Sequence, residues 1–165
     1  MWWHYRKYDG EYPVWAFVEV ISLGTLVNFY QFCADRLDRT DMINEGYLLI
    51  KIKELRNASA HSNCIIHALG KKDATYRIGK IVYSALTPIS KETKRTQLKN
   101  ERTSQITTLL FSHKHFVSSK GVHSRAGHDL RELSTRMNLN LDYYANNKNI
   151  TAFFSFFEKL IDIFF

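Results

Sequence analysis

Residues 150–165 place the strongest constraint on how this 165-residue chain can fold. Their apolar side chains recur at helical spacing and leave only a narrow polar stripe, which consists of Ser155, Glu158, Lys159 and Asp162. The other positions are mostly large and apolar, among them Phe153, Phe154, Phe156, Phe157, Leu160, Ile161 and Phe164. A helix with so broad an apolar face has to pack on two neighbours, either inside a bundle or across a dimer. Asn149 is the predicted cap of this helix.

The rest of the chain also has helical periodicity. Apolar spacing predicts further helices over residues 13–33, 43–64, 73–87, 106–117 and 121–140, with Asp73 as the cap of the third. Strand alternation and internal repeats are absent from the sequence, and only two prolines and seven glycines interrupt it. With 45% apolar residues, a chain of this length can bury a sizeable core. We therefore predict one all-α domain over residues 1–165.

Residues 14–33 are apolar on nearly all sides and long enough to cross a bilayer. Glu19, Asn28 and Gln31 would then lie in the membrane, and one central carboxylate costs about 2.5–3.5 kcal/mol on insertion scales. A core helix at the centre of a bundle is the better interpretation, with Gly24 at a close helix crossing. No membrane partner is predicted.

Glu19 then needs an explanation, because a buried carboxylate without a partner costs several kcal/mol. One interpretation is a supporting role, in which Glu19 orients Arg56 or His61 on the next helix. The other is that Glu19 simply lies at the surface of the bundle. The sequence leaves both open.

The two cysteines, Cys33 and Cys64, form no C-x-x-C pair, which argues against a disulfide framework or a zinc ribbon. Cys64 is predicted to be a buried, inert thiol. His61, Cys64 and His67 follow one another at steps of three, which spreads them too widely around a helix for one metal ion. The usual nucleotide and hydrolase motifs are absent, so no metal or cofactor is predicted. The N-terminus lacks the apolar run of a signal peptide, and we expect a cytoplasmic protein.

The net charge of +7 is concentrated in the middle of the chain. Residues 71–120 hold eleven Lys and Arg against three Asp and Glu, a net charge of +8, whereas residues 1–70 and 121–165 are nearly neutral. Such an excess indicates either a solvated basic face or a site for a polyanion. In the second case the residues expected to bind RNA are Lys71, Lys72, Arg77, Lys80, Lys94, Arg95, Lys99 and Arg102.

Residues 55–67 combine three polar groups of catalytic type in the sequence L-R-N-A-S-A-H-S-N-C-I-I-H. Arg56 supplies a permanent cation, Asn57 an amide and His61 a titratable imidazole. On a helix Asn57 and His61 lie one above the other, since they are four residues apart. By itself the Arg-x4-His spacing is a weak signal, and an exposed arginine and a hydrogen-bonded histidine near a helix end would also explain it.

The residues around this pair are a more specific signal than the spacing alone. The run Arg56-Asn57-x-x-Ala60-His61 resembles the R-N-x-x-A-H signature of the HEPN superfamily of α-helical RNases. Upstream, P-V-W-A-F-V-E-V-I-S-L-G-T-L over residues 13–26 resembles a motif of the abortive-infection branch of that superfamily (Abi-like, Abi-D/Abi-F type). The resemblance covers roughly residues 12–69 and implies a HEPN-like helical bundle with additional C-terminal helices.

Two features depart from the family pattern. Family members are usually longer at the N-terminus, so this chain resembles a shortened relative or a fragment. After the histidine, relatives tend to carry an arginine and then an asparagine, and the corresponding places here fall near Asn63 or Cys64 and His67. The second departure affects the handling of the substrate more than the Arg-x4-His pair.

The resemblance implies a mechanism as well as a fold. Enzymes of the superfamily pair two Arg-x4-His helices across a homodimer to form one metal-independent endoribonuclease site. Arg56, Asn57 and His61 would be the catalytic residues, with Asn57 orienting the histidine or contacting the scissile phosphate. Cleavage would leave a 2′,3′-cyclic phosphate and a 5′-hydroxyl.

The implied function is therefore a phage-defence (abortive-infection) or toxin RNase that acts on RNA as a homodimer. An antitoxin protein or a small non-coding RNA is a possible further partner. The alternative is a non-catalytic RNA-binding or scaffold protein of the same fold, in which Arg56 and His61 only hold phosphate.

Overall fold

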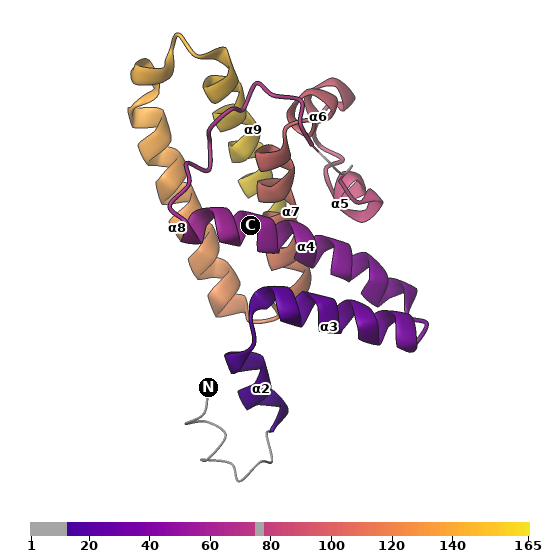
Figure 1. Ribbon diagram of the computed structural model, residues 1–165. Coiled ribbons are helices and arrows are strands. Elements are labelled where there is room, and N and C mark those ends of the chain that lie inside the picture. Colours follow the sequence, from indigo (N-terminus) through magenta and orange to yellow (C-terminus); the bar gives the residue numbers. More distant parts are fainter. Residues whose placement is uncertain (1–12, 75–77) are drawn as a thin grey trace. The chain divides into compact units, whose positions relative to one another are not determined.

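The computed structural model describes residues 13–74 and 78–165, and within these ranges the chain is all-α (Figure 1). This confirms the predicted fold class. The elements in chain order are α2 (Val14–Val20), α3 (Leu23–Arg36), α4 (Thr40–Ala60), α5 (Lys80–Ala85), α6 (Lys91–Gln97), α7 (Glu101–Phe116), α8 (Lys120–Leu139), the 3₁₀ helix η1 (Leu141–Tyr144) and α9 (Lys148–Phe164).

The chain divides into two compact units, residues 1–53 and residues 54–165, with the boundary inside α4. The single domain over residues 1–165 stays a prediction. In the described ranges, every helix is too short or too polar to cross a membrane.

In the first unit, the single helix predicted over residues 13–33 is wrong, because the chain forms two helices there. Ile21 and Ser22 are extended, with ψ angles of 152° and 151°. The Ser22 hydroxyl accepts a hydrogen bond from the Thr25 N–H at 3.0 Å and so caps α3. Serine at this position favours a helix start over the continuation of α2, since its side chain replaces a missing backbone partner.

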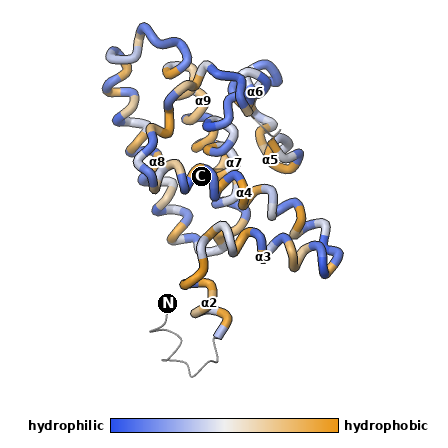
Figure 2. The backbone as a smooth tube through the Cα atoms, viewed as in Figure 1, coloured by the Kyte–Doolittle hydropathy of each residue, from blue (hydrophilic) through white to orange (hydrophobic). Residues whose placement is uncertain are grey.

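The apolar side chains of α2 do not form a core, contrary to the prediction. Val14 is 79% exposed and Trp15 is 58% exposed, whereas the buried side chain of α2 is the small Ala16. Figure 2 shows α2 as hydrophobic along most of its length. Apolar spacing therefore predicted a helix here correctly, but it did not predict which residues are buried.

Helices α3 and α4 pack closely at Gly46, not at Gly24. A Cβ atom added to Gly46 would lie 3.1 Å from Cγ of Gln31, whereas one at Gly24 would meet only ordinary contacts, the nearest at 3.6 Å. Close by, the hydroxyl of Tyr30 donates a hydrogen bond to Glu45. Burial and this carboxylate raise the pKa of Tyr30 to about 12.

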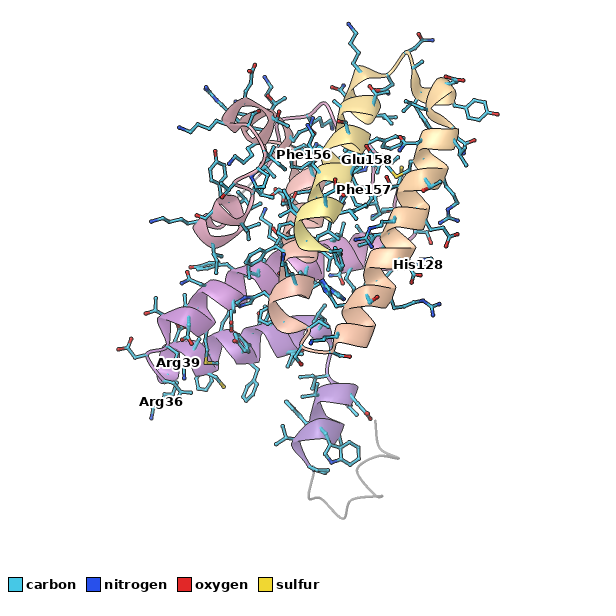
Figure 3. All side chains as sticks on the ribbon, turned by 180° about the vertical axis from the view of Figure 1, so that it is seen from behind. Arg36, Arg39, His128, Phe156, Phe157 and Glu158 are labelled. Atoms are coloured by element: carbon cyan, nitrogen blue, oxygen red, sulfur yellow. The ribbon has the colours of Figure 1, made fainter. Side chains whose placement is uncertain are left out.

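The second unit has its core around α9, which packs between α7 and α8 (Figures 1 and 3). The buried side chains of α9 include all seven apolar residues predicted for its face, and each contributes about 1.5–3 kcal/mol. In its polar stripe, Glu158 accepts hydrogen bonds from Ser134 and Asn138 of α8. Asn147, not Asn149, caps α9, because its side chain accepts hydrogen bonds from the N–H groups of Asn149 and Ile150. Core packing inside the unit accounts for the broad apolar face.

Two helix starts in this unit differ from the predictions. Helix α5 begins only at Lys80, and its cap position is Gly79. Asp73, the expected cap, instead accepts a hydrogen bond from the N–H of Glu101 at 3.1 Å and thus stabilises the start of α7. This hydrogen bond joins residues that are 28 positions apart in the sequence, so local spacing could not predict it.

At the far end of α7, His113 meets His123 of α8. Their Nδ1 atoms are 3.3 Å apart, and both rings pack against Phe165. Burial and the neighbouring His123 lower the pKa of His113.

Candidate functional site

The polar motif occupies the last turn of α4 and the residues just after it. The helix runs from Thr40 to Ala60, so it is shifted from the predicted range of 43–64, and His61 is its first residue outside. Ser62 has a left-handed φ of 54°. Three N–H groups then return to carbonyls of the last turn: His61 to Asn57, Ser62 to Ser59 and Asn63 to Ala58, each at 3.0 Å. This is a Schellman ending, which fixes the backbone of His61.

The side chains of the motif are exposed, whereas the opposite face of α4 is buried. Arg56, Asn57 and His61 are all exposed. Leu55 and Ala58, which alternate with them, are 7% and 5% exposed. The helix therefore holds the motif from behind by core packing and presents its polar groups to solvent.

Arg56 and Asn57 contact each other. The Nη1 atom of Arg56 donates a hydrogen bond to Oδ1 of Asn57 at 3.1 Å. The resemblance had implied that Asn57 orients His61 or contacts a phosphate, and this role stays a prediction. The carbonyl oxygen of Asn57 faces the guanidinium of Arg56. The amide nitrogen of Asn57 remains the group that can meet a ligand.

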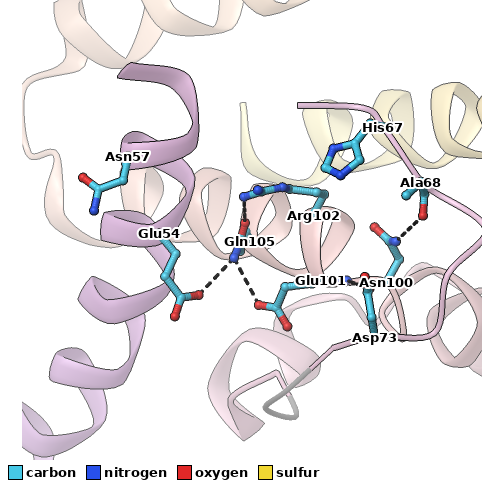
Figure 4. A pocket seen from close by; sticks show the side chains of 9 residues that line it. All are labelled: Glu54, Asn57, His67, Ala68, Asp73, Asn100, Glu101, Arg102 and Gln105. Carbon is cyan, nitrogen blue, oxygen red and sulfur yellow. Dashed lines mark hydrogen bonds between the residues drawn. The ribbon is translucent and has the colours of Figure 1, made fainter. Parts of the chain in front are cut away.

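An open pocket of about 490 Å³ lies beside Asn57 (Figure 4). It is bounded by the end of α4, the start of α7 and the connection that follows the motif. Its lining residues are Glu54, Asn57, His67, Ala68, Asp73, Asn100, Glu101, Arg102 and Gln105. All nine belong to the second unit.

Gln105 organises the carboxylates of this pocket, although it is only 3% exposed. Its Nε2 donates to Oε2 of Glu54 at 3.0 Å and to Oε1 of Glu101 at 3.2 Å, as the dashed lines in Figure 4 show. Its Oε1 accepts from Nη1 of Arg102 at 2.8 Å. Because the arginine can only donate, this contact fixes which end of the amide faces the carboxylates. The Gln105 amide thus holds two carboxylates in place, Glu54 of α4 and Glu101 of α7.

Asn100 holds the connection after the motif against α7. Its Nδ2 donates to the carbonyls of Ala68 at 3.0 Å and Lys71 at 3.2 Å, and its Oδ1 accepts from the N–H of Thr103 at 3.1 Å. Asn100 is 3% exposed and also the cap of α7. This buried amide places His67 and Ala68 at the edge of the pocket.

The pocket is acidic, in contrast to the basic region around it. Glu54, Asp73 and Glu101 carry three negative charges against the one positive charge of Arg102, which leaves −2 with His67 neutral. Such a pocket repels phosphate and favours a cation or a neutral group with N–H donors.

The structure also places the residues predicted to bind RNA. Lys71, Lys72, Lys80, Arg95 and Lys99 are exposed. Arg102 is half-buried and donates to Gln105. Lys94 is 7% exposed, donates to the carbonyl of Leu86 at 3.2 Å and lies 4.6 Å from the centre of the Tyr83 ring. Its ammonium is therefore turned into the protein. Arg77 lies outside the described residues.

Two further predictions concern single side chains. Glu19 is exposed on α2, as the second of its two interpretations expected, and its supporting role stays a prediction. Cys64 is exposed and free, so the expectation of a buried thiol is wrong. The reason is that α4 ends four residues earlier and leaves Cys64 in the connection. In the described ranges, no group of three or more His, Cys, Asp or Glu side chains is placed to hold a metal.

Sequence reasoning missed Glu54, Asn100 and Gln105. Asn100 directly before Glu101 has the composition of a helix start. Gln105 follows Arg102 by three and Glu101 by four residues, which are the spacings of neighbours on one helix face. The contact between Gln105 and Glu54 spans 51 residues, and local spacing gives no sign of it.

A family model for Abi-like proteins matches residues 1–67, a range that contains the whole of the Arg-Asn-x-x-Ala-His run. The match supports a protein of the abortive-infection type. The chain matches no curated protein and no solved structure with significance.

Proposed function

We propose that this protein is a metal-independent endoribonuclease of an abortive-infection type, with Arg56, Asn57 and His61 as its catalytic residues. The observation that carries the proposal is the Arg-Asn-x-x-Ala-His run, which lies at the exposed end of α4 and inside the segment similar to Abi-like proteins. The HEPN resemblance of this run supplies the reaction class.

The residue types suit cleavage of RNA by its own 2′-hydroxyl. This reaction needs a base for the hydroxyl proton, an acid for the departing 5′-oxygen and positive charge on the pentacovalent phosphate. Imidazole can serve in both proton roles, and a guanidinium donates a bidentate fork to phosphate oxygens. His61 supplies one imidazole and Arg56 supplies one guanidinium. The products would be a 2′,3′-cyclic phosphate and a 5′-hydroxyl.

One chain offers a single set of these groups, whereas in-line cleavage asks for a base and an acid on opposite sides of the phosphate. A homodimer in which two α4 ends converge would supply the second set. The exposure of Arg56 and His61 leaves them accessible to a second copy. The composite site remains part of the proposal.

The test is incubation of the purified protein with end-labelled RNA in the presence of EDTA, followed by identification of the product ends. We expect cleavage with cyclic phosphate ends. His61→Ala should abolish cleavage, and His128→Ala, which changes an exposed histidine of α8 (Figure 3), should cleave like the parent. Metal-dependent cleavage or equal rates for both variants would refute the proposal.

A non-catalytic RNA-binding or scaffold role is the second candidate, and the five exposed cations Lys71, Lys72, Lys80, Arg95 and Lys99 favour it. In that case RNA would bind with an affinity that falls steeply with salt, because each neutralised phosphate contributes about −0.7 to −0.9 to the slope of log K against log salt. No products would form, and His61→Ala would bind RNA more weakly than the parent, because in this case His61 only helps to hold phosphate. The EDTA assay separates the two candidates.

A further inference from the structure

We propose that the acidic pocket beside Asn57 reads the base of an unpaired guanosine next to the cleaved phosphate, with the Glu54 carboxylate as acceptor for its Watson–Crick edge. This inference deepens the proposed function and rests on it for the RNA substrate. It assigns to Glu54 a role in specificity, separate from the chemistry of Arg56 and His61.

The charge of the pocket decides what kind of group can enter it. A formal charge of −2 repels the phosphate backbone. Exposed cations such as Lys71, Lys72 and Lys99 lie near it in the chain and offer the backbone a better place. A nucleotide could then keep its phosphate outside and insert only its base, which is how single-stranded RNA is usually read.

The polar groups of the pocket select the base. Two of its carboxylates, Glu54 and Glu101, are acceptors only, so the base has to present N–H donors. Guanine presents two neighbouring donors, N1–H and N2–H, whose spacing matches the two oxygens of one carboxylate. Adenine and cytosine each present one amino group beside an acceptor that would face the second oxygen. Uracil presents one donor between two acceptors.

Glu54 is the better positioned of the two carboxylates. Its Oε2 already accepts from Gln105, but each carboxylate oxygen has two lone pairs, so both oxygens can still accept from a base. The buried Gln105, itself oriented by Arg102, prevents the carboxylate from turning away. A preorganised acceptor loses little freedom on binding, which favours discrimination.

The position of Glu54 also suits a base beside the cleaved bond. Glu54, Asn57 and His61 follow at steps of three and four along α4 and its end, so they share one face. Glu54 lies about 10 Å from His61 along the helix axis. That separation is comparable to the reach of one nucleotide from base to phosphate. The pocket volume of about 490 Å³ lies in the usual range for sites that hold a small ligand.

The test uses the His61→Ala protein, so that RNA is bound without being cut, and short fluorescent oligouridines that carry one guanosine, inosine or adenosine. We expect guanosine to bind about tenfold or more tightly than adenosine. Inosine, which lacks the N2 amino group, should lie between them. Adding Glu54→Gln should remove the preference, because an amide opposes one donor of guanine with a donor of its own.

Asp73→Asn is the matched control. It removes the same unit of charge from the pocket, and its amide oxygen can still accept from the N–H of Glu101. We expect it to strengthen binding of all three oligonucleotides alike and to keep their ratio. If it abolishes the preference as Glu54→Gln does, charge alone explains the effect and the inference is wrong.

Equal affinities for guanosine and adenosine, or no RNA binding at all, would also overturn the inference. If the preference exists but the parent protein cuts no RNA, the proposed endoribonuclease fails while the pocket assignment stands. If the parent cuts RNA without regard to guanosine, the proposed endoribonuclease stands and the pocket assignment fails. A pocket that binds free arginine amide and ignores all three oligonucleotides would point to a protein partner and against this proposal.

Discussion

The exposed end of α4 and the pocket beside it hold their polar groups in opposite ways. Arg56 and His61 face solvent, and the guanidinium of Arg56 donates a hydrogen bond to the adjacent Asn57. Asn100 and Gln105 are each 3% exposed, and their amides reach three segments of the chain. We therefore expect that the first group can be altered without disturbing the fold, whereas the second helps to define it.

Under the proposed function, the two regions would divide their tasks. Groups that act on a substrate have to remain accessible, and the buried face of α4 gives them a fixed position without using their hydrogen bonds. Groups that shape a pocket are most useful when every donor and acceptor is satisfied, since buried networks with gaps are costly. Substitutions in the two regions should therefore separate activity from stability.

The largest effect is expected for Arg56→Ala, which should lower RNA cleavage by roughly a hundredfold to a thousandfold through loss of charge stabilisation at the phosphate. The melting temperature should stay close to that of the parent, because surface substitutions usually change stability by less than about 0.5 kcal/mol. Arg56→Lys should recover only part of the activity, since an ammonium cannot form the bidentate fork. A large drop in the melting temperature would show that Arg56 contributes to the fold, contrary to the expectation for an exposed residue.

Asn100→Ala should show the opposite pattern, with a loss of about 2–4 kcal/mol in the free energy of unfolding. The estimate combines a lost helix cap with carbonyls left without a partner. Asn100→Ser is the control, because its hydroxyl keeps an oxygen for the cap but is too short to reach the carbonyls of Ala68 and Lys71. It should fall between Asn100→Ala and the parent in urea denaturation. Parental stability for both variants would show that this network does not define the fold.

These two regions were predicted from the sequence to very different degrees. The sequence identified Arg56, Asn57 and His61 because they lie within one short motif. Their exposure follows from the alternation with the buried Leu55 and Ala58. The contact of Gln105 with Glu54 could not be predicted, since α5, α6 and their connections separate α4 from α7 and local spacing carries no signal over that distance.

The fold shows the same division. The all-α class and the face of α9 followed from apolar spacing, which responds to long helices with large side chains. The break at Ser22 and the end of α4 at Ala60 depended on single hydrogen bonds and one left-handed residue, Ser62, for which an apolar pattern carries no signal. The caps of α5 and α9 were accordingly misplaced.

A tenfold effect is expected when two versions of the exposed motif are mixed. If the site is composite, a ninefold excess of His61→Ala chains, after exchange, should reduce activity per parent chain about tenfold below simple dilution. The same excess of His128→Ala chains should have no such effect. Activity that falls only in proportion to dilution, together with a monomeric mass in light scattering, would mean that each exposed motif works alone.

The smallest effect concerns His113 and His123, which lie outside both regions and are only partly buried. The folded state holds the pKa of His113 below its ordinary value near 6.5, so the unfolded chain takes up the proton more readily. This contribution to stability is present above about pH 6.5 and is lost as the pH falls through the lowered pKa. Urea midpoints at pH 7 and pH 5 measure it. His123→Gln should reduce the difference, and an unchanged difference would exclude the histidine pair as its cause.

The ending of α4 has a consequence for the time scale on which the motif can move. The N–H groups of His61, Ser62 and Asn63 all bond back into the last turn, although these residues lie beyond the helix. Their amide protons should exchange with solvent as slowly as those inside the helix end, although their side chains are exposed. The imidazole of His61 would then change rotamer while its backbone opens only rarely. An RNA that binds there would find the Cα atom of His61 in the same position each time.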